Sequence, residues 1–171
     1  VMVEPPLEIE SESNDTLGTA DALAFETTPN GFSGSVYGQV GSNSDFDYFS
    51  LGTIDPGQTV FLSTRIPVSG KVVPVVALYN ATNQFQNESL GGRDGDGAAV
   101  VDIAVGGEYF ALVRSVGDGG GPLFNDYALD VQILPTGVTN FPNLQVTEVT
   151  LPPETGLKSG QQASFSFRVE N

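Results

Sequence analysis

Residues 127–134, Tyr-Ala-Leu-Asp-Val-Gln-Ile-Leu, place an apolar side chain at every second position. Successive side chains of a β-strand point to opposite faces of a sheet, so this spacing gathers the apolar residues on one face. The period of two predicts a strand that turns one face toward a core and the other toward solvent. The predicted core face consists of Tyr127, Leu129, Val131 and Ile133.

Short runs of β-favouring residues recur along the rest of the chain, separated by Gly, Pro, Asn and Asp. This pattern predicts an all-β fold, namely a β-sandwich. In residues 109–115 both faces are largely apolar, which predicts a central strand. Residues 19–25 are expected to form a short helical turn. The other predicted strands of the sandwich are 34–40, 48–51, 59–64, 72–79 and 98–105.

Composition changes divide the chain into four predicted parts. These are an extended acidic leader (1–16), the sandwich (17–134), a linker (135–142) and a two-strand segment (143–171). Two strands alone are marginally stable in water. We therefore expect the apolar stripe of the last segment to pack on another copy of the chain; the alternative is a domain whose remaining strands lie beyond residue 171. The stripe consists of Leu144, Val146, Val149, Leu151, Phe165, Phe167 and Val169.

The leader contains a cluster of oxygen-bearing side chains. In an extended chain Glu10, Glu12 and Asn14 point to one side, and a turn can bring Asp15 to them. Six to eight oxygen ligands are what Ca²⁺ requires. The first 64 residues contain ten acidic residues and no Lys or Arg, so a cation is needed to offset their repulsion. The sequence thus predicts calcium binding, with a solvated acidic tail as the alternative.

Two further acidic pairs are candidate metal ligands. Asp45 and Asp47 are two residues apart and share a face, either as ligands or as a charged start of a strand. Asp94 and Asp96 resemble half of a calcium loop, but the remaining ligands and the final Glu of an EF-hand are absent. They are weaker candidates, and an ordinary turn is the favoured interpretation.

The absence of His and Cys excludes several kinds of chemistry. Ser-His and Cys-His catalysis, His or thiolate zinc sites and disulfides all need these residues, so we expect no catalytic activity. The net charge of −15 disfavours nucleic acid and anionic membrane surfaces as partners. Apolar runs fall short of the ~20 residues of a membrane span. The acidic, Lys-poor composition suits an extracellular protein. N-glycosylation sequons begin at Asn80 and Asn87, and they would matter only in a eukaryotic secretory pathway.

The order of several motifs resembles the bacterial pre-peptidase C-terminal (PPC) domain, which is related to clostridial collagen-binding domains. The resemblance covers residues 8–134. It implies a jelly-roll-like antiparallel β-sandwich, secretion by a prokaryote, and a calcium site that joins the leader (Glu10, Glu12, Asn14, Asp15) to Asp45 and Asp47. The matching motifs are Glu10-x-Glu12-x-Asn14-Asp15 with Thr19-Ala20, Asp45-x-Asp47-Tyr48-Phe49, Leu78-Tyr79, Gly107-Glu-Tyr109-Phe110-Ala-Leu-Val113 and Asp126-Tyr127-Ala-Leu129.

Residues 142–171 resemble the first two strands of a cell-adhesion-related, CARDB-like Ig domain of bacterial surface proteins. The likeness rests on Pro142-Asn-Leu-Gln-Val-Thr, Gly160-Gln and Phe167-Arg-Val-Glu-Asn171. This segment would be an Ig-like β-hairpin extension of the sandwich. Two functions are consistent with these features. The chain is either a calcium-binding structural subunit that assembles head-to-tail into a filament or surface polymer, or an accessory targeting or spacer module of a secreted protease or adhesin that binds extracellular matrix or polysaccharide.

Overall fold

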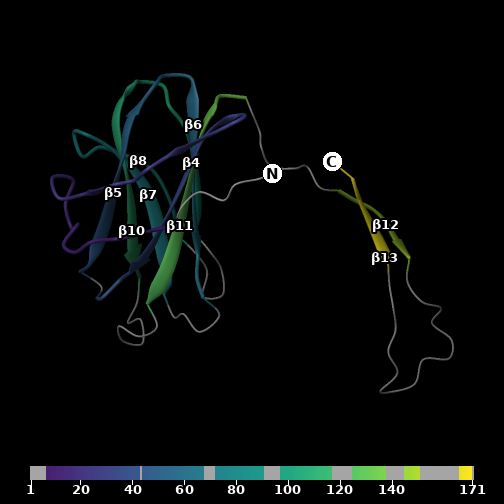
Figure 1. Cartoon of the computed structure of the whole chain (residues 1–171), viewed down its shortest axis with the longest axis horizontal. Coiled ribbons are helices and arrows are strands. Elements are labelled where there is room, and N and C mark those ends of the chain that lie inside the picture. The colour runs from purple at the N-terminus through teal and green to yellow at the C-terminus, as the bar shows by residue number, and fades with distance from the viewer. Residues whose placement is uncertain are drawn as a thin grey trace, which may run out of the picture. The chain divides into compact units, whose positions relative to one another are not determined.

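The computed structural model describes residues 7–42, 44–67, 72–90, 97–116, 125–137, 145–150 and 166–170. These ranges contain strands and turns, and no helix among them is long and apolar enough to cross a membrane. Contacts within the chain divide it into two compact units, Val1–Val138 and Thr139–Asn171. The first unit is a sandwich of two β-sheets (Figure 1), so the predicted all-β sandwich is confirmed.

The first sheet has β11 at its centre, between β4 and β6, with both pairs antiparallel. Its strand order is β1-β4-β11-β6-β9, and β3 also pairs with β4. The strands are β1 (Leu7–Ile9), β3 (Glu26–Thr28), β4 (Gly31–Gln39), β6 (Gln58–Arg65), β9 (Ala98–Asp102) and β11 (Asp126–Pro135).

The second sheet has the order β2-β5-β10-β7-β8. Its middle strand is β10, which pairs antiparallel with β5 on one side and β7 on the other. The central position predicted for residues 109–115 is therefore confirmed. The strands are β2 (Asp21–Ala22), β5 (Phe46–Ile54), β7 (Pro74–Asn80), β8 (Phe85–Leu90) and β10 (Gly107–Ser115).

The core fills the space between the two sheets. The predicted inner face of β11 is buried, with Tyr127 and Leu129 at 0% exposure, Val131 at 1% and Ile133 at 5%. Residues of β5, β7 and β10 meet this face from the other sheet. Burial of each large apolar side chain contributes about 1.5–3 kcal/mol, so these two faces hold the sheets together.

The N-terminal segment adds a parallel strand to each sheet. β1 pairs parallel with β4, and β2 pairs parallel with β5, so both sheets are mixed. The helical turn expected at residues 19–25 is not formed, because Asp21 and Ala22 instead pair with Phe49 and Ser50 of β5. Main-chain pairing with a sheet edge thus overrides a weak local helical preference.

The described residues of the second unit form an antiparallel pair, β12 (Gln145–Thr150) with β13 (Ser166–Glu170). Val146 lies opposite Val169, and Val149 lies opposite Phe167. Leu144, Leu151 and Phe165 lie outside the described residues. The hairpin predicted for this part of the chain is present, and its proposed packing on another copy remains a prediction.

Candidate metal centre

The leader connects the two sheets through residues 10–14. After β1, the N–H of Glu10 donates to the carbonyl of Tyr37 on β4 at 3.0 Å. The chain then crosses to the second sheet, where the N–H of Tyr48 on β5 donates to the carbonyl of Asn14 at 3.0 Å. The crossing segment is visible in purple between β4 and β5 (Figure 1). Residues 10–14 are thereby held at both ends, by β4 of the first sheet and β5 of the second.

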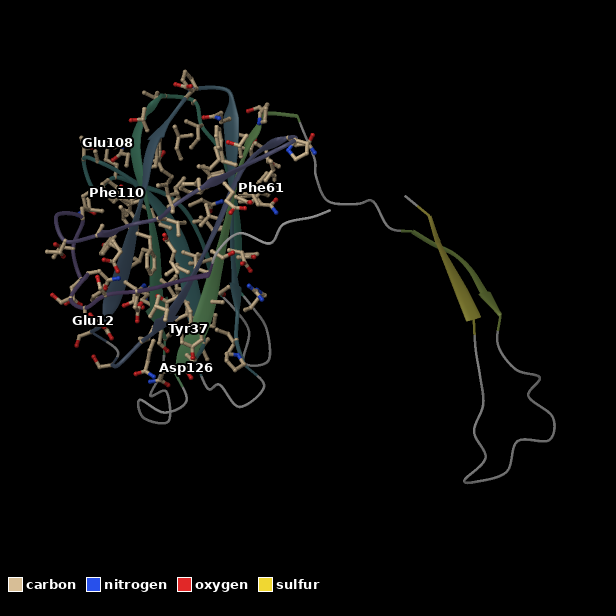
Figure 2. All side chains as sticks on the ribbon, in the orientation of Figure 1. Glu12, Tyr37, Phe61, Glu108, Phe110 and Asp126 are labelled. Atoms are coloured by element: carbon tan, nitrogen blue, oxygen red, sulfur yellow. The ribbon has the colours of Figure 1, made fainter. Side chains whose placement is uncertain are left out.

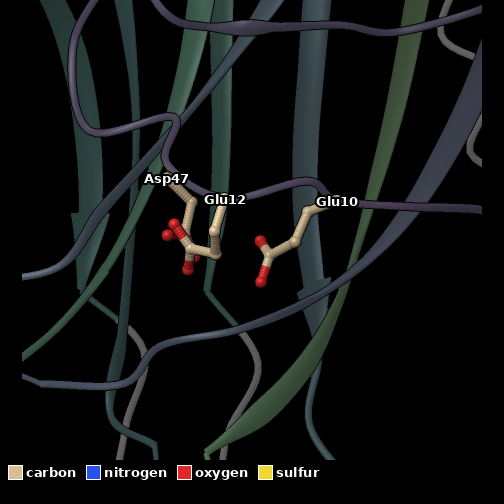
Figure 3. A group of neighbouring side chains, drawn as sticks. All are labelled: Glu10, Glu12 and Asp47. Atoms are coloured by element: carbon tan, nitrogen blue, oxygen red, sulfur yellow. The ribbon is translucent and has the colours of Figure 1, made fainter.

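This crossing brings together three carboxylates, those of Glu10, Glu12 and Asp47. One oxygen from each lies within 4.8 Å of the others. Figure 3 shows the three side chains converging, two from the leader and one from β5. Glu10 is half-buried, Glu12 is exposed and Asp47 has no exposed surface, so the cluster extends from solvent into the protein.

A buried tyrosine completes the inner side of the cluster. The hydroxyl of Tyr127 lies 2.6 Å from Oδ2 of Asp47 and 3.0 Å from Oε2 of Glu10. It has a single proton to donate to these two carboxylates. Oε1 of Glu10 accepts the N–H of Gln39 at 2.5 Å. Two carboxylates are therefore oriented by neutral donors, with no Lys or Arg among these contacts.

A glycine on β4 makes this arrangement possible. Gly38 lies opposite Tyr127 in the sheet, and a Cβ atom at this position would come 2.5 Å from Cζ of Tyr127 and still closer to Oε2 of Glu10. A side chain would occupy the space in which Glu10 and Tyr127 meet. Neither Gly38 nor Tyr127 was predicted as a site residue. Tyr127 was expected in the core, and its hydroxyl gives that position a second role.

Burial and mutual repulsion raise the proton affinity of the cluster. Burial raises the pKa of Glu10 to about 7, and the Gln39 N–H and the Tyr127 hydroxyl partly oppose this shift. Burial, followed by repulsion from Glu10, raises the pKa of Asp47 to about 8. The pKa of Glu12 is also raised, by burial and by Asp45 and Asp15. A cluster of this kind favours either protons or a cation over bare charge.

Three oxygen and nitrogen atoms at the site are buried without a hydrogen-bond partner in the described structure. They are Oδ1 of Asp47 and the Oδ1 and Nδ2 atoms of Asn14. Asn14 has no exposed surface. The Asn14 N–H donates to the Glu12 carboxylate, which places Asn14 beside the cluster. Buried polar atoms are normally paired, so these atoms have coordinating capacity that the described protein groups do not use. Carboxylate and amide oxygens are hard donors that fit Ca²⁺.

The other sequence-predicted ligands lie at different positions. Asp15 is exposed, and Oδ1 accepts the N–H of Phe46 at 3.4 Å. Oδ2 of Asp45 accepts the N–H of Gly41 at 2.5 Å. Both carboxylates are outside the three-residue cluster, although Asp45 is close enough to raise the pKa of Glu10, Glu12 and Asp47. Asp94 and Asp96 lie outside the described residues.

A second surface feature is an aromatic ridge, defined by Tyr48, Tyr79 and Phe85, on the outer face of the second sheet. Tyr48 and Tyr79 make an edge-to-face contact with ring centroids 6.1 Å apart, and Tyr79 and Phe85 make another at 5.7 Å. Tyr48 pairs with Leu112, and Tyr79 pairs with Phe110. Phe85 is 51% exposed. The sequence did not reveal this ridge, because it depends on the register of three strands.

The sequence matches no family model and no curated protein, whereas its structure is similar to several solved structures. The pre-peptidase C-terminal domain of Bacillus anthracis collagenase is 12% identical, with 77% of this chain and 100% of that chain covered and a TM-score of 0.44. PliG of Aeromonas hydrophila, a periplasmic inhibitor of g-type lysozyme, is 13% identical, with 75% and 99% covered and a TM-score of 0.43.

A CBM4 structure is 12% identical, with 63% of this chain and 83% of that chain covered and a TM-score of 0.34. Such similarity concerns the fold. The β-sandwich of this chain is established by its own strand pairing.

Proposed function

We propose that this chain is a non-catalytic, calcium-binding module that acts outside the cytoplasm of a prokaryote. The observation that carries the proposal is the convergence of Glu10, Glu12 and Asp47 around buried oxygens that lack partners. A divalent cation would offset the burial of negative charge and the mutual repulsion, which together raise the pKa of all three carboxylates.

The donor set favours calcium over other common cations. Ca²⁺ accepts six to eight oxygens in flexible geometry, whereas Mg²⁺ needs a near-ideal octahedron and usually keeps several waters. Glu10, Glu12, Asp47 and the amide oxygen of Asn14 would supply protein ligands, and the exposed side at Glu12 leaves room for water. The sequence has no His or Cys, so the preferred zinc ligands are absent.

Calcium at this position would connect the two sheets. Glu10 follows β1 at the edge of the first sheet, and Asp47 belongs to β5 of the second sheet. An ion bound to both would tie the leader and the two sheets at one end of the sandwich. An ion that binds the folded state alone stabilises it by about 2.7 kcal/mol at a hundredfold excess over its dissociation constant.

The experiment compares thermal melting of the calcium-free protein with and without added calcium. We expect the melting temperature to rise with calcium and to fall again on addition of a chelator. Glu12→Gln should weaken this response, while Glu26→Gln, a substitution of an acidic residue on β3, should leave it intact. Equal melting temperatures with calcium and with chelator would contradict the proposal.

As an accessory module, the chain would bind an extracellular matrix polymer or a polysaccharide. The aromatic ridge of Tyr48, Tyr79 and Phe85 supports this role, because exposed aromatic rings offer large contact area at low entropic cost. Pull-down on an insoluble polysaccharide or on collagen tests it. Binding that survives Phe85→Ala, or no binding to either material, would exclude the ridge as the contact surface.

The second candidate function is head-to-tail self-assembly through the C-terminal hairpin. It is favoured by the pairing of β12 and β13 as a two-stranded sheet in a unit of its own. A sheet of two strands has two edges with free N–H and C=O groups, which can accept a strand from another chain. Contacts between different surfaces of identical chains produce rings or filaments.

A further inference from the structure

The outer faces of the two sheets differ in their chemistry. On the first sheet, the carboxylate of Asp130 accepts hydrogen bonds from the hydroxyl of Ser35 at 2.6 Å and from Nη2 of Arg65 at 3.0 Å. On the second sheet, Phe110 and Leu112 of β10 alternate with core residues, so they point outward, yet they are only 9% and 2% exposed. Figure 2 shows Phe110 on the side of the sandwich that the second sheet forms. The central strand of this sheet is therefore apolar on both faces.

The aromatic ridge lies on this outer face. Tyr48 is the cross-strand neighbour of Leu112, and Tyr79 is the cross-strand neighbour of Phe110. Edge-to-face contacts hold the ring of Tyr79 between the rings of Tyr48 and Phe85. The ridge is thus supported by buried neighbours, while Phe85 keeps 51% of its surface exposed. A binding surface that is fixed in this way loses little conformational entropy when a ligand docks on it.

The spacing and the tilt of the three rings restrict the shape of the ligand. Centroids of successive rings are 6.1 Å and 5.7 Å apart, which is close to the length of one pyranose unit in a polysaccharide. Neighbouring ring planes are inclined by 64° and 65°, so the rings do not form a flat platform. The flat surface of a crystalline polysaccharide cannot lie against all three ring faces. A single chain that twists from one sugar to the next can follow them.

The chemistry of the ridge favours a neutral sugar chain over other polymers. Aromatic faces carry partial negative charge and attract C–H bonds, which cover the faces of a pyranose ring. The phenolic hydroxyls of Tyr48 and Tyr79 can both donate to and accept from sugar hydroxyls. A net charge of −15 repels polyanions. An extended peptide strand binds through main-chain hydrogen bonds at a sheet edge, and the face of a sheet does not offer them.

We propose that the aromatic ridge binds a single, twisted chain of a neutral polysaccharide, with successive sugars on Tyr48, Tyr79 and Phe85. The C–H faces of the sugars stack on the rings, and their hydroxyls hydrogen-bond to the two tyrosines. This inference rests on the accessory role proposed above and narrows its ligand from matrix polymers in general to one class. Crystalline polysaccharide, polyanionic polysaccharide and collagen are not ligands of the ridge.

The test is affinity electrophoresis of the full chain, with calcium, in native gels that contain a dissolved neutral polysaccharide. The probes are hydroxyethylcellulose, soluble starch, lichenan and galactomannan, with alginate as the polyanionic comparison. We expect slower migration in at least one neutral gel than in a gel without polysaccharide, and unchanged migration in alginate. Sedimentation with microcrystalline cellulose and with insoluble collagen should leave the protein in solution.

Substitutions at Phe85 separate stacking on the ridge from other contacts. Phe85→Ala and Phe85→Leu should each weaken binding roughly three- to tenfold, because the exposed half of the ring no longer covers a sugar. Phe85→Tyr keeps the ring and should retain binding. Phe32→Ala is the matched control, since Phe32 is 41% exposed but lies on β4 of the first sheet. All variants should keep the calcium-dependent shift in melting temperature, which shows that they are folded.

The possible failures point to different errors. Binding to collagen, with unchanged migration in every neutral gel, would overturn this inference and leave the accessory role intact. Sedimentation with microcrystalline cellulose that Phe85→Ala abolishes would show that the ridge acts as a flat platform, which contradicts a single twisted chain. Equal loss of binding in Phe85→Ala and Phe32→Ala would remove the ridge from the contact surface. A chain that binds none of these materials would refute both the inference and the accessory role.

Discussion

The hydroxyl of Tyr127 lies 2.6 Å from the buried carboxylate of Asp47 and 3.0 Å from that of Glu10. Tyr127 belongs to β11 in the first sheet and Asp47 to β5 in the second, so this contact crosses the sandwich. It links the hydrophobic core, where the ring lies, to the acidic cluster. Outer partners of this kind orient metal ligands, and their loss commonly weakens metal binding 10–100-fold.

Tyr127→Phe should therefore weaken calcium binding by roughly tenfold or more, because Glu10 and Asp47 lose the donor that orients them. Isothermal titration calorimetry of the calcium-free protein would measure the change. Tyr109→Phe is the matched control, since Tyr109 is also buried and its hydroxyl donates to the carbonyl of Val105 at 2.6 Å. Equal calcium affinities in the two variants would show that the Tyr127 hydroxyl has no role at the site.

The stability of the calcium-free protein should decrease as the pH rises. Burial raises the pKa of Glu10 to about 7 and that of Asp47 to about 8, from their ordinary values of 4.5 and 3.8. Between about pH 4 and pH 8 the folded state thus binds more protons than the unfolded state, so each rise in pH favours unfolding. Melting temperatures measured with chelator should fall across this window and fall less with calcium present.

Two comparisons isolate the cluster from the general repulsion of an acidic chain. Asp47→Asn removes one of the titrating groups, so its melting temperature in chelator should depend less steeply on pH. Glu26→Gln changes the net charge by the same amount, but Glu26 lies on β3. The melting temperature of this variant in chelator should therefore depend on pH as steeply as that of the unchanged chain. A calcium-free protein that melts at a higher temperature at pH 8 than at pH 5 would contradict the raised pKa values.

Gly38→Ala should disrupt the site through a single methyl group. The new Cβ would lie 2.5 Å from Cζ of Tyr127, whose side chain is buried and cannot move aside. Overpacking of this kind costs about 1–3 kcal/mol, and we expect the melting temperature and the calcium response to fall together. Differential scanning fluorimetry with and without calcium would measure both.

Gly18→Ala is the control for this substitution. A Cβ at Gly18 would make one ordinary contact, 3.9 Å from the Thr16 hydroxyl. Its effect on the free energy of unfolding should stay within about 0.5 kcal/mol. If Gly38→Ala and Gly18→Ala change the melting temperature and the calcium response equally, the close approach at Gly38 does not affect the site.

The core could be predicted from the sequence because it depends on local alternation. The period of two in residues 127–134 places Tyr127 and Leu129 on the buried face of β11, and the structure confirms it. β8 was not predicted, since Phe85–Leu90 has the sequence Phe-Gln-Asn-Glu-Ser-Leu, with no alternation. It is an edge strand, and its place follows from main-chain pairing with β7. Main-chain pairing places few requirements on the side chains, so the sequence of β8 does not reveal it.

The candidate site was predictable in part for the same reason. The Glu-x-Glu spacing of Glu10 and Glu12 is local, and a lack of nearby bases is visible in the sequence. The contribution of Tyr127 is not visible, because 117 residues separate it from Glu10 along the chain. The space for their contact depends on Gly38 in a third segment. Long-range register determines these contacts, and a single sequence does not contain that information.

Deletion of residues 142–171 should abolish head-to-tail assembly while the sandwich stays folded. The deleted part contains β12 and β13, and the remaining residues contain the whole of the sandwich and the acidic cluster. Multi-angle light scattering at high protein concentration with calcium would give the mass of each form. We expect large, polydisperse assemblies from the intact chain and monomers from the shortened one, with the same calcium-dependent melting in both. Assembly of the shortened chain, or a monomeric intact chain, would show that the hairpin does not join copies of this protein.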